Sequence, residues 1–318
     1  KSIDVTMKGP LFYSKILLFG EYGIIRDSKG LSIPYNFYNG ALKLDENPSA
    51  EAMKSNASLK RYVEYLEQLQ NDQPELVTFN IEALKTDVSN GMYFDSSIPQ
   101  GYGVGSSGAL VAAIYDKYAN NTITVLENLT REKLLQLKNI FSQMESFFHG
   151  KSSGLDPLNS YLSIPILINS KDNIEATGIP SQSATGKGAV FLLDSGIVGE
   201  TAPMVNIFME NLKEEGFRKM LKNQFVKYTD ACVENFLGGD MKSLFKNTKQ
   251  LSKVVLNHFK PMIPEQFHGV WQQGIDTNDY YLKLCGSGGG GYILGFTEDL
   301  EKAKQSLKDY KLEVVYQF

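Results

Sequence analysis

The chain has 318 residues, of which 42% are apolar and 21% charged, and its net charge at neutral pH is −4. This composition is typical of a globular enzyme built as one large or two smaller domains. The slight acidity gives no reason to expect a nucleic acid or an anionic membrane as partner. No apolar run approaches the roughly 18 residues that cross a bilayer, so no membrane partner is expected either.

Secretion and metal chemistry based on thiols are disfavoured as well. The first residues lack the apolar core of a secretion signal. The two cysteines, Cys232 and Cys285, lie far apart, and the chain has only three histidines. A disulfide framework or a zinc site is therefore not expected. We expect a cytoplasmic protein.

The first half of the chain alternates predicted strands and helices. Strands are predicted over 3–8, 11–19, 30–37, 76–83 and 91–95, and helices over 58–69, 110–118 and 131–148. The second half begins with strands over 164–169 and 189–194. Helices then dominate from 203 to 273, with interruptions at 238–239 and 261–264. The end of the chain has strands over 280–284, 292–296 and 312–316, a helix over 298–310 and a Gly-rich loop over 285–291.

A Gly-rich loop over residues 99–109 directly precedes the predicted helix 110–118. Gly101, Gly103 and Gly105 alternate with other residues, and Ser106 and Ser107 follow. Glycines let the backbone turn tightly and expose its N–H groups, and a helix amino terminus attracts anions. This pattern indicates a phosphate-binding loop, although a tight turn with a serine cap would have the same composition.

The same loop matches the dinucleotide-binding pattern at Gly103, Gly105 and Gly108, and residues 122–127 resemble a strand that ends in an acid. This keeps a nicotinamide-dependent oxidoreductase open as an alternative. Against it, residues 95–100 separate the loop from the preceding strand, whereas the dinucleotide turn follows its strand directly. A Walker A loop is excluded because no Lys-Ser or Lys-Thr pair follows the glycines.

Three charged residues have an ordinary and a functional interpretation. Lys15 is a single charge in an apolar strand, where it either reaches water at a sheet edge or serves as a positioned cation. Asp156 lies three residues after Ser153, in the spacing of a capping box, and could simply cap a helix. Glu145 could be a solvated helix charge.

Two further residues have a structural interpretation. His149 is interpreted as a structural helix terminator and Cys285 as a small buried residue.

Three segments together resemble the motifs of the GHMP kinases, the small-molecule kinases named for galacto-, homoserine, mevalonate and phosphomevalonate kinase. Residues 14–25 (SKILLFGEYGII) resemble the first motif, and residues 99–109 (PQGYGVGSSGA) the phosphate-binding second motif. Residues 283–292 (KLCGSGGGGY) resemble the third motif. The segments follow the order of the family and span the whole chain.

Within the family, residues 145–156 (ESFFHGKSSGLD) look most like mevalonate kinase. Ile24 stands where galactokinases carry an aspartate, and phosphomevalonate kinases, which often have Gly-Glu-Tyr in the first motif, are the closest alternative. The chain departs from the usual motifs at three places. Tyr22 replaces histidine, Gly108 replaces alanine, and Cys285 replaces threonine or serine.

The resemblance implies an α+β fold of two domains, an amino-terminal ribosomal-protein-S5-like domain (1–180) that binds ATP and a carboxy-terminal ferredoxin-like domain (181–318), with the active site in the cleft between them. It further implies ATP- and Mg²⁺-dependent phosphorylation of a small-molecule alcohol, most simply mevalonate in isoprenoid biosynthesis. Lys15 and Asp156 would be catalytic, and Ser107 and Glu145 would hold Mg²⁺. The nucleotide would contact Gly101, Gly103, Val104, Gly105, Ser106, Ser107 and Gly108, and the substrate region would include Glu21, Tyr22, Gly286, Ser287 and Gly288.

Two further possibilities stay open at this stage. The first is a non-catalytic sensor with the same fold, although such relatives usually lose the catalytic carboxylate or disturb the glycine loop. The second is that the chain forms a homodimer, which the sequence does not decide.

Overall fold

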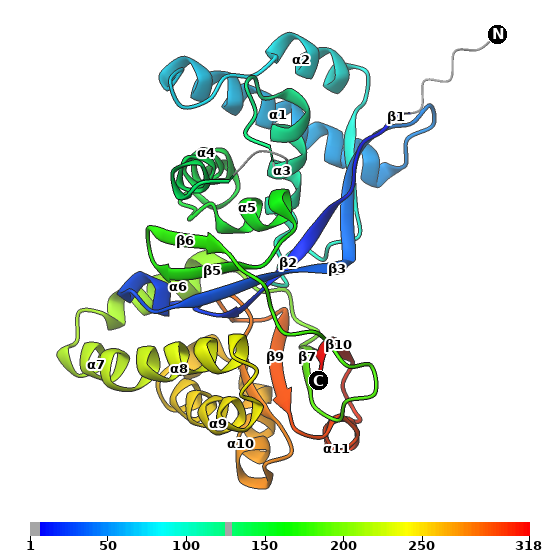
Figure 1. Ribbon diagram of the computed structural model, residues 1–318. Helices are drawn as coiled ribbons and strands as arrows, with labels where there is room; N and C mark the ends of the chain where they lie inside the picture. Colours follow the sequence, from blue (N-terminus) through cyan, green and yellow to red (C-terminus); the bar gives the residue numbers. More distant parts are fainter. Residues whose placement is uncertain (1–6, 125–128) are drawn as a thin grey trace. The chain divides into compact units, whose positions relative to one another are not determined.

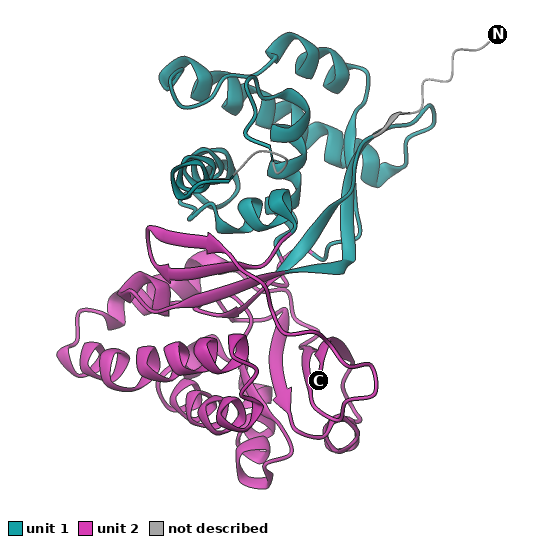
Figure 2. Ribbon diagram, viewed as in Figure 1, with its two compact units in different colours: residues 1–15, 34–99, 105–163 teal, residues 16–33, 100–104, 164–318 magenta. Residues whose placement is uncertain are grey.

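The computed structural model describes residues 7–124 and 129–318, and it divides into two compact units (Figure 2). Unit 1 comprises residues 1–15, 34–99 and 105–163, and unit 2 comprises residues 16–33, 100–104 and 164–318. The division falls inside strands β2 (Phe12–Phe19) and β3 (Gly30–Leu44) and inside the Gly-rich loop, so the units interleave along the sequence. The described chain has two sheets and mixed α and β content, as predicted.

Unit 1 consists mainly of helices beside short strands and the carboxy-terminal part of β3 (Figure 1 and Figure 2). Its helices are α1 (Ala50–Asp72), α2 (Ile81–Ser89), α3 (Ser106–Tyr118), α4 (Arg131–His149) and α5 (Leu155–Leu162). The short strands β1 (Met7–Lys8) and β4 (Tyr93–Ser96) pair antiparallel with the carboxy-terminal part of β3. The predicted helix 58–69 is confirmed as part of α1, which buries one face at Leu59, Tyr62, Val63, Leu66 and Leu69.

Helices α3, α4 and α5 share an aromatic contact in the core of unit 1. The rings of Tyr115, Phe141 and Tyr161, one from each helix, lie with centroids 5.0, 5.2 and 5.5 Å apart and meet edge to face. Such pairs add to the stabilisation from apolar burial and fix the relative orientation of the elements that carry them. This packing positions the amino-terminal ends of α3 and α5.

Unit 2 contains an antiparallel sheet in the order β10-β7-β9-β8. Its strands are β7 (Ala189–Asp194), β8 (Tyr281–Leu284), β9 (Tyr292–Thr297) and β10 (Leu312–Gln317). Strands β5 (Ile166–Ser170) and β6 (Asn173–Ala176) form a hairpin, and β5 pairs with the start of β3. The helices are α6 (Thr201–Asn211), α7 (Glu215–Met220), α8 (Val226–Leu237), α9 (Met241–His258), α10 (His268–Thr277) and α11 (Leu300–Ser306), with a π-helical turn at Leu221–Phe225.

Several predicted elements need correction. The predicted strand 76–83 is wrong, since only Phe79 makes an isolated bridge, and Asn80 caps α2 by accepting the Ala83 N–H at 3.1 Å. The predicted capping box at Ser153 is also wrong, because Gly154, in left-handed conformation, occupies the N-cap position directly before α5, and no side chain caps the helix there. The predicted strands 3–8 and 122–127 lie partly outside the described residues, at 3–6 and 125–127.

Candidate active site

Lys15 and Asp156 form an ion pair in unit 1. The Lys15 Nζ lies 3.0 Å from Asp156 Oδ1, and the lysine side chain is 5% exposed whereas the aspartate is 39% exposed. Lys15 therefore does not reach water at a sheet edge. Gly105, at the start of α3, lies against both residues, since a Cβ there would be 3.1 Å from Lys15 Cγ and 3.8 Å from Asp156 Cβ. The arrangement places a buried cation and a partly exposed carboxylate at the amino-terminal end of a helix.

The Gly-rich loop has the backbone that its sequence predicts. Gly101, Gly103 and Gly105 have φ angles of 74°, 79° and 84°, a region that favours glycine. In unit 1 the loop leads into α3, whose first residues, Ser106, Ser107 and Gly108, present N–H groups without partners inside the helix. In unit 2, a Cβ on Gly103 would lie 2.5 Å from the Cys285 carbonyl oxygen, so glycine is required for this close approach.

A cluster of oxygen and nitrogen donors surrounds Glu145 in unit 1. Its carboxylate is buried and accepts hydrogen bonds from the hydroxyls of Ser107, at 3.0 Å, and Ser152. The Nε2 of His149 lies 2.8 Å from the same Ser107 oxygen. Burial is the main cause that raises the pKa of Glu145 to about 7, and repulsion from Asp156 is the second. Two carboxylates held near each other in this way favour a cation between or beside them.

Unit 2 contains a second buried ion pair, between Glu21 and Lys283. The two charged atoms are 2.7 Å apart, and the side chains are only 4% and 2% exposed. The Lys283 ammonium also donates to the Leu284 carbonyl at 2.9 Å, directly before the third-motif loop (Cys285–Gly291). The neighbouring Tyr22 donates its hydroxyl proton to the Ser287 carbonyl of that loop. The turn of the first motif is thereby linked to the third motif.

The structure brings the predicted residues together in two groups, one in each unit. Lys15, Gly105, Ser106, Ser107, Gly108, Glu145 and Asp156 gather in unit 1, and Glu21, Tyr22, Gly101, Gly103, Val104, Gly286, Ser287 and Gly288 belong to unit 2. Sequence reasoning assigned no functional role to Lys283 or Ser152 and interpreted His149 as structural. Lys283 carried a usable signal, because it is the single charge in an apolar strand, as Lys15 is.

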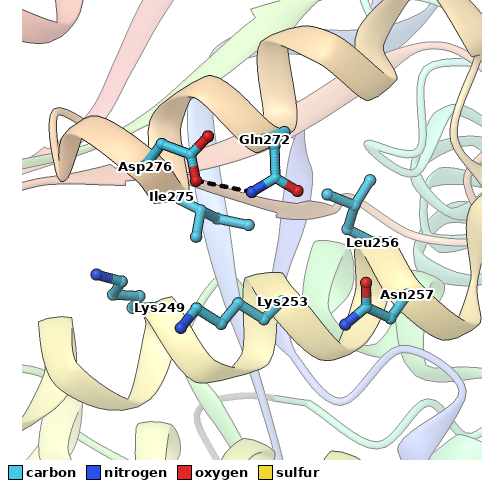
Figure 3. Close-up of a pocket in the computed structure, with 7 residues that line it drawn as sticks. All are labelled: Lys249, Lys253, Leu256, Asn257, Gln272, Ile275 and Asp276. Atoms are coloured by element: carbon cyan, nitrogen blue, oxygen red, sulfur yellow. Dashed lines mark hydrogen bonds between the residues drawn. The ribbon is translucent and has the colours of Figure 1, made fainter.

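Unit 2 also has a hollow that none of the predicted site residues lines. It has a volume of about 440 Å³ and lies between α9, which supplies Lys249, Lys253 and Asn257, and α10, which supplies Gln272 and Asp276 (Figure 3). A second hollow of about 450 Å³ borders Gly289 of the third-motif loop. No helix of the described residues is long and apolar enough to span a membrane. Within these residues no three His, Cys, Asp or Glu side chains gather as a metal cluster.

Comparison with known proteins finds a family model that matches part of the chain and solved structures that share its fold. Residues 60–163 match the family model described as "GHMP kinases N terminal domain". A search of curated proteins by sequence finds no match. Among solved structures, mevalonate kinase from L. major, in complex with R-mevalonate, is 17% identical with a TM-score of 0.63 and covers 100% of this chain and 99% of its own.

Two other kinases show the same fold. Phosphomevalonate kinase from Streptococcus pneumoniae is 12% identical with a TM-score of 0.60, and the alignment covers 98% of this chain and 99% of that one. Galactokinase from Lactococcus lactis, complexed with galactose, is 11% identical with a TM-score of 0.64, and the alignment covers 99% of this chain and 94% of the galactokinase chain. Residues 60–163 therefore match the amino-terminal domain of the GHMP kinases, and the whole chain has the same fold as solved kinases of small molecules.

Proposed function

We propose that the protein phosphorylates mevalonate at its primary hydroxyl with ATP, by direct in-line transfer. The observation that carries the proposal is the Lys15–Asp156 ion pair against Gly105, at the amino terminus of α3. Phosphoryl transfer needs mainly positioning and charge neutralisation, and this geometry supplies both. The spacing of Glu145, His149 and Asp156 and the fold of the L. major enzyme support mevalonate as the acceptor.

Each residue in unit 1 has a proposed task. Asp156 accepts the proton of the substrate hydroxyl or orients it, because its carboxylate is the exposed member of the pair. Lys15 lowers the pKa of that hydroxyl and stabilises the charge that develops on the transferred group. The backbone N–H groups of residues 103–107 hold the triphosphate, as expected for a glycine loop that opens a helix.

The residues around Glu145 fit a magnesium ion. Mg²⁺ prefers oxygen ligands and retains several waters, and the Ser107 hydroxyl and Glu145 carboxylate are oxygen donors in contact with each other. A cation there would also relieve the repulsion between Glu145 and Asp156, which helps to raise the Glu145 pKa. When bound with ATP, Mg²⁺ would neutralise phosphate charge.

We further propose that residues 1–180 form the ATP-binding domain and residues 181–318 the second domain.

The second candidate acceptor is 5-phosphomevalonate. It is favoured by Tyr22 in the Gly-Glu-Tyr turn and by the fold of the S. pneumoniae enzyme. This acceptor carries an additional dianion, which calls for basic residues beside it, and Lys151 and Arg26 are the candidates that the sequence offers.

A panel of acceptors tests the proposal. ADP release is measured with R-mevalonate, 5-phosphomevalonate, galactose and homoserine, and nicotinamide turnover is followed in parallel. We expect kcat/KM for R-mevalonate to exceed that for every other acceptor by about ten-fold or more, a discrimination of about 1.4 kcal/mol. A higher value for 5-phosphomevalonate would support the second candidate. Absence of ADP release with all acceptors would contradict kinase activity toward them and favour a sensor.

A further inference from the structure

The third-motif loop presents a row of backbone N–H groups without partners. Among the described residues, the amides of Gly286, Ser287 and Gly288 donate no hydrogen bond, whereas those of Gly289 and Gly291 donate to Met262 and Ile197. Gly286 and Gly288 have φ angles of 80° and 82°. Successive amides in such a backbone form a concave site for an anion. Because glycine-rich backbone is flexible, these amides need fixing from outside the loop to point in one direction.

Tyr22 supplies such a contact at the centre of this row. Its hydroxyl donates to the Ser287 carbonyl, which belongs to the same peptide unit as the Gly288 N–H. A trans peptide is planar, and its N–H and C=O groups point in opposite directions, so fixing the carbonyl oxygen also fixes the direction of the amide. Donation to the carbonyl further polarises the peptide and strengthens its N–H as a donor.

The conformation of Tyr22 is unfavourable by itself and is maintained by its surroundings. Its φ angle is 61°, which is uncommon for a residue with a bulky side chain. The ring is buried between Phe208 and Phe259, with centroids 4.7 and 5.9 Å away. Strained residues of this kind cluster at functional sites, where the surrounding structure imposes the geometry.

We propose that Tyr22 is a positioning residue, whose hydroxyl aims the Gly288 N–H at an oxygen of a phosphate group bound by the third-motif loop. The inference rests on the proposed kinase function and assigns a task to the side chain that replaces the histidine usual in the first motif. The buried Lys283 makes a second contact next to the loop, because its ammonium donates to the carbonyl of Leu284, the residue directly before the loop. Tyr22 acts through the loop and does not itself touch the reacting atoms.

Tyr22→Phe tests the inference because it removes the hydroxyl and keeps the ring between Phe208 and Phe259. Its matched control is Tyr280→Phe, which removes another hydroxyl that donates to a carbonyl in unit 2, that of Val270 at 2.7 Å. Loss of a preorganised donor in the transition state lowers kcat. We expect kcat of Tyr22→Phe to fall about ten-fold or more, with KM for ATP changed by less than about three-fold, at equal folded fraction. A kcat within about two-fold of Tyr280→Phe would overturn the inference.

Hydrogen exchange of the free protein gives a readout that does not depend on activity. We expect exchange of the hydrogen-bonded amides of Gly289 and Gly291 to be faster by about ten-fold in Tyr22→Phe than in the wild type, and unchanged in Tyr280→Phe, because a local opening of the loop becomes easier. Unchanged exchange of this loop in Tyr22→Phe would contradict the positioning role. If the wild type phosphorylates no acceptor, the proposed function fails, while the exchange experiment still decides whether Tyr22 fixes the loop.

Discussion

Two lysines in this protein lie buried within strands, and each pairs with a carboxylate that is distant in sequence. Lys15 meets Asp156, and Lys283 meets Glu21. The apolar neighbours of both lysines indicate from sequence alone that burial is possible. They do not reveal the partner, because an ion pair across 141 or 262 residues depends on the tertiary fold. The sequence alone therefore leaves two interpretations open for Lys15 and indicates no role for Lys283.

The Glu21–Lys283 pair leads to a prediction about stability. Removing one partner leaves the other charge buried, so Lys283→Met should lower the free energy of unfolding by about 3–5 kcal/mol. The double variant Lys283→Met with Glu21→Gln should recover part of that loss. Urea unfolding measures both, and Lys219→Met, which breaks an exposed pair with Glu215, should cost no more than about 1 kcal/mol. Equal costs for Lys283→Met and Lys219→Met would contradict the burial of this pair.

Glu145 makes the stability of the metal-free protein depend on pH. Because its pKa is raised from 4.5 to about 7, the folded protein binds this proton more tightly than the unfolded chain does. The stabilisation is full below about pH 4.5 and is lost as the pH rises through about 7. The free energy of unfolding of Glu145→Gln, relative to that of the wild type, should therefore increase from pH 5 to pH 8 by on the order of 3 kcal/mol.

Urea unfolding in a chelating buffer at several pH values tests this effect. Glu132→Gln, which removes an exposed carboxylate from the same helix, is the matched control. A stability difference between Glu145→Gln and the wild type that stays constant from pH 5 to pH 8 would show that Glu145 does not take up a proton in this range on folding.

At the scale of elements, the packing of α3 against α5 explains why Gly108 replaces the alanine usual in the second motif. A Cβ at Gly108 would lie 2.8 Å from the Asp156 carbonyl carbon and 2.9 Å from the Pro157 nitrogen. These are backbone atoms, so α5 would have to move. The sequence revealed that the family residue was absent, but the reason became visible only with the approach of the two helices.

Gly108→Ala should therefore disturb catalysis through the position of Asp156. We expect a loss of stability of about 1–3 kcal/mol from overpacking. A displacement of Asp156 by about 1 Å should lower kcat by up to about 100-fold. Gly216→Ala in α7, where nothing lies within 4 Å of the added Cβ, should be neutral or stabilising by up to about 1 kcal/mol. Thermal unfolding and ADP release measure the two effects, and unchanged kcat in Gly108→Ala would refute the explanation.

The predictability of individual elements follows their periodicity. The helix α4 and residues 58–69 of α1 were predicted because their apolar residues recur at helical spacing over several turns. Residues 76–83 have the composition of a strand, but Asn80, a residue type favoured at helix amino termini, caps α2. The short strand β6 was not predicted, because its four residues owe their conformation to the pairing with β5.

At the scale of the molecule, motif order was the strongest sequence signal. The three motifs indicated one family although no single glycine loop did, and the family match and the shared fold agree with them. The sequence does not show which oxygen atoms surround Glu145, nor which residue contacts the third-motif loop. Both depend on contacts between segments that are far apart along the chain.

The central claim is that Lys15 and Asp156 act together on an alcohol that receives phosphate from ATP. The most direct test measures ADP release with saturating ATP and R-mevalonate for Lys15→Met and Asp156→Asn, together with ATP affinity by calorimetry. The control is Lys43→Met, which removes a strand lysine that pairs with Asp45 at 3.7 Å in unit 1. The account predicts a loss of turnover of about 10²–10⁴ in both variants, with ATP affinity retained and the control near normal. Near-normal turnover in either folded variant would contradict it.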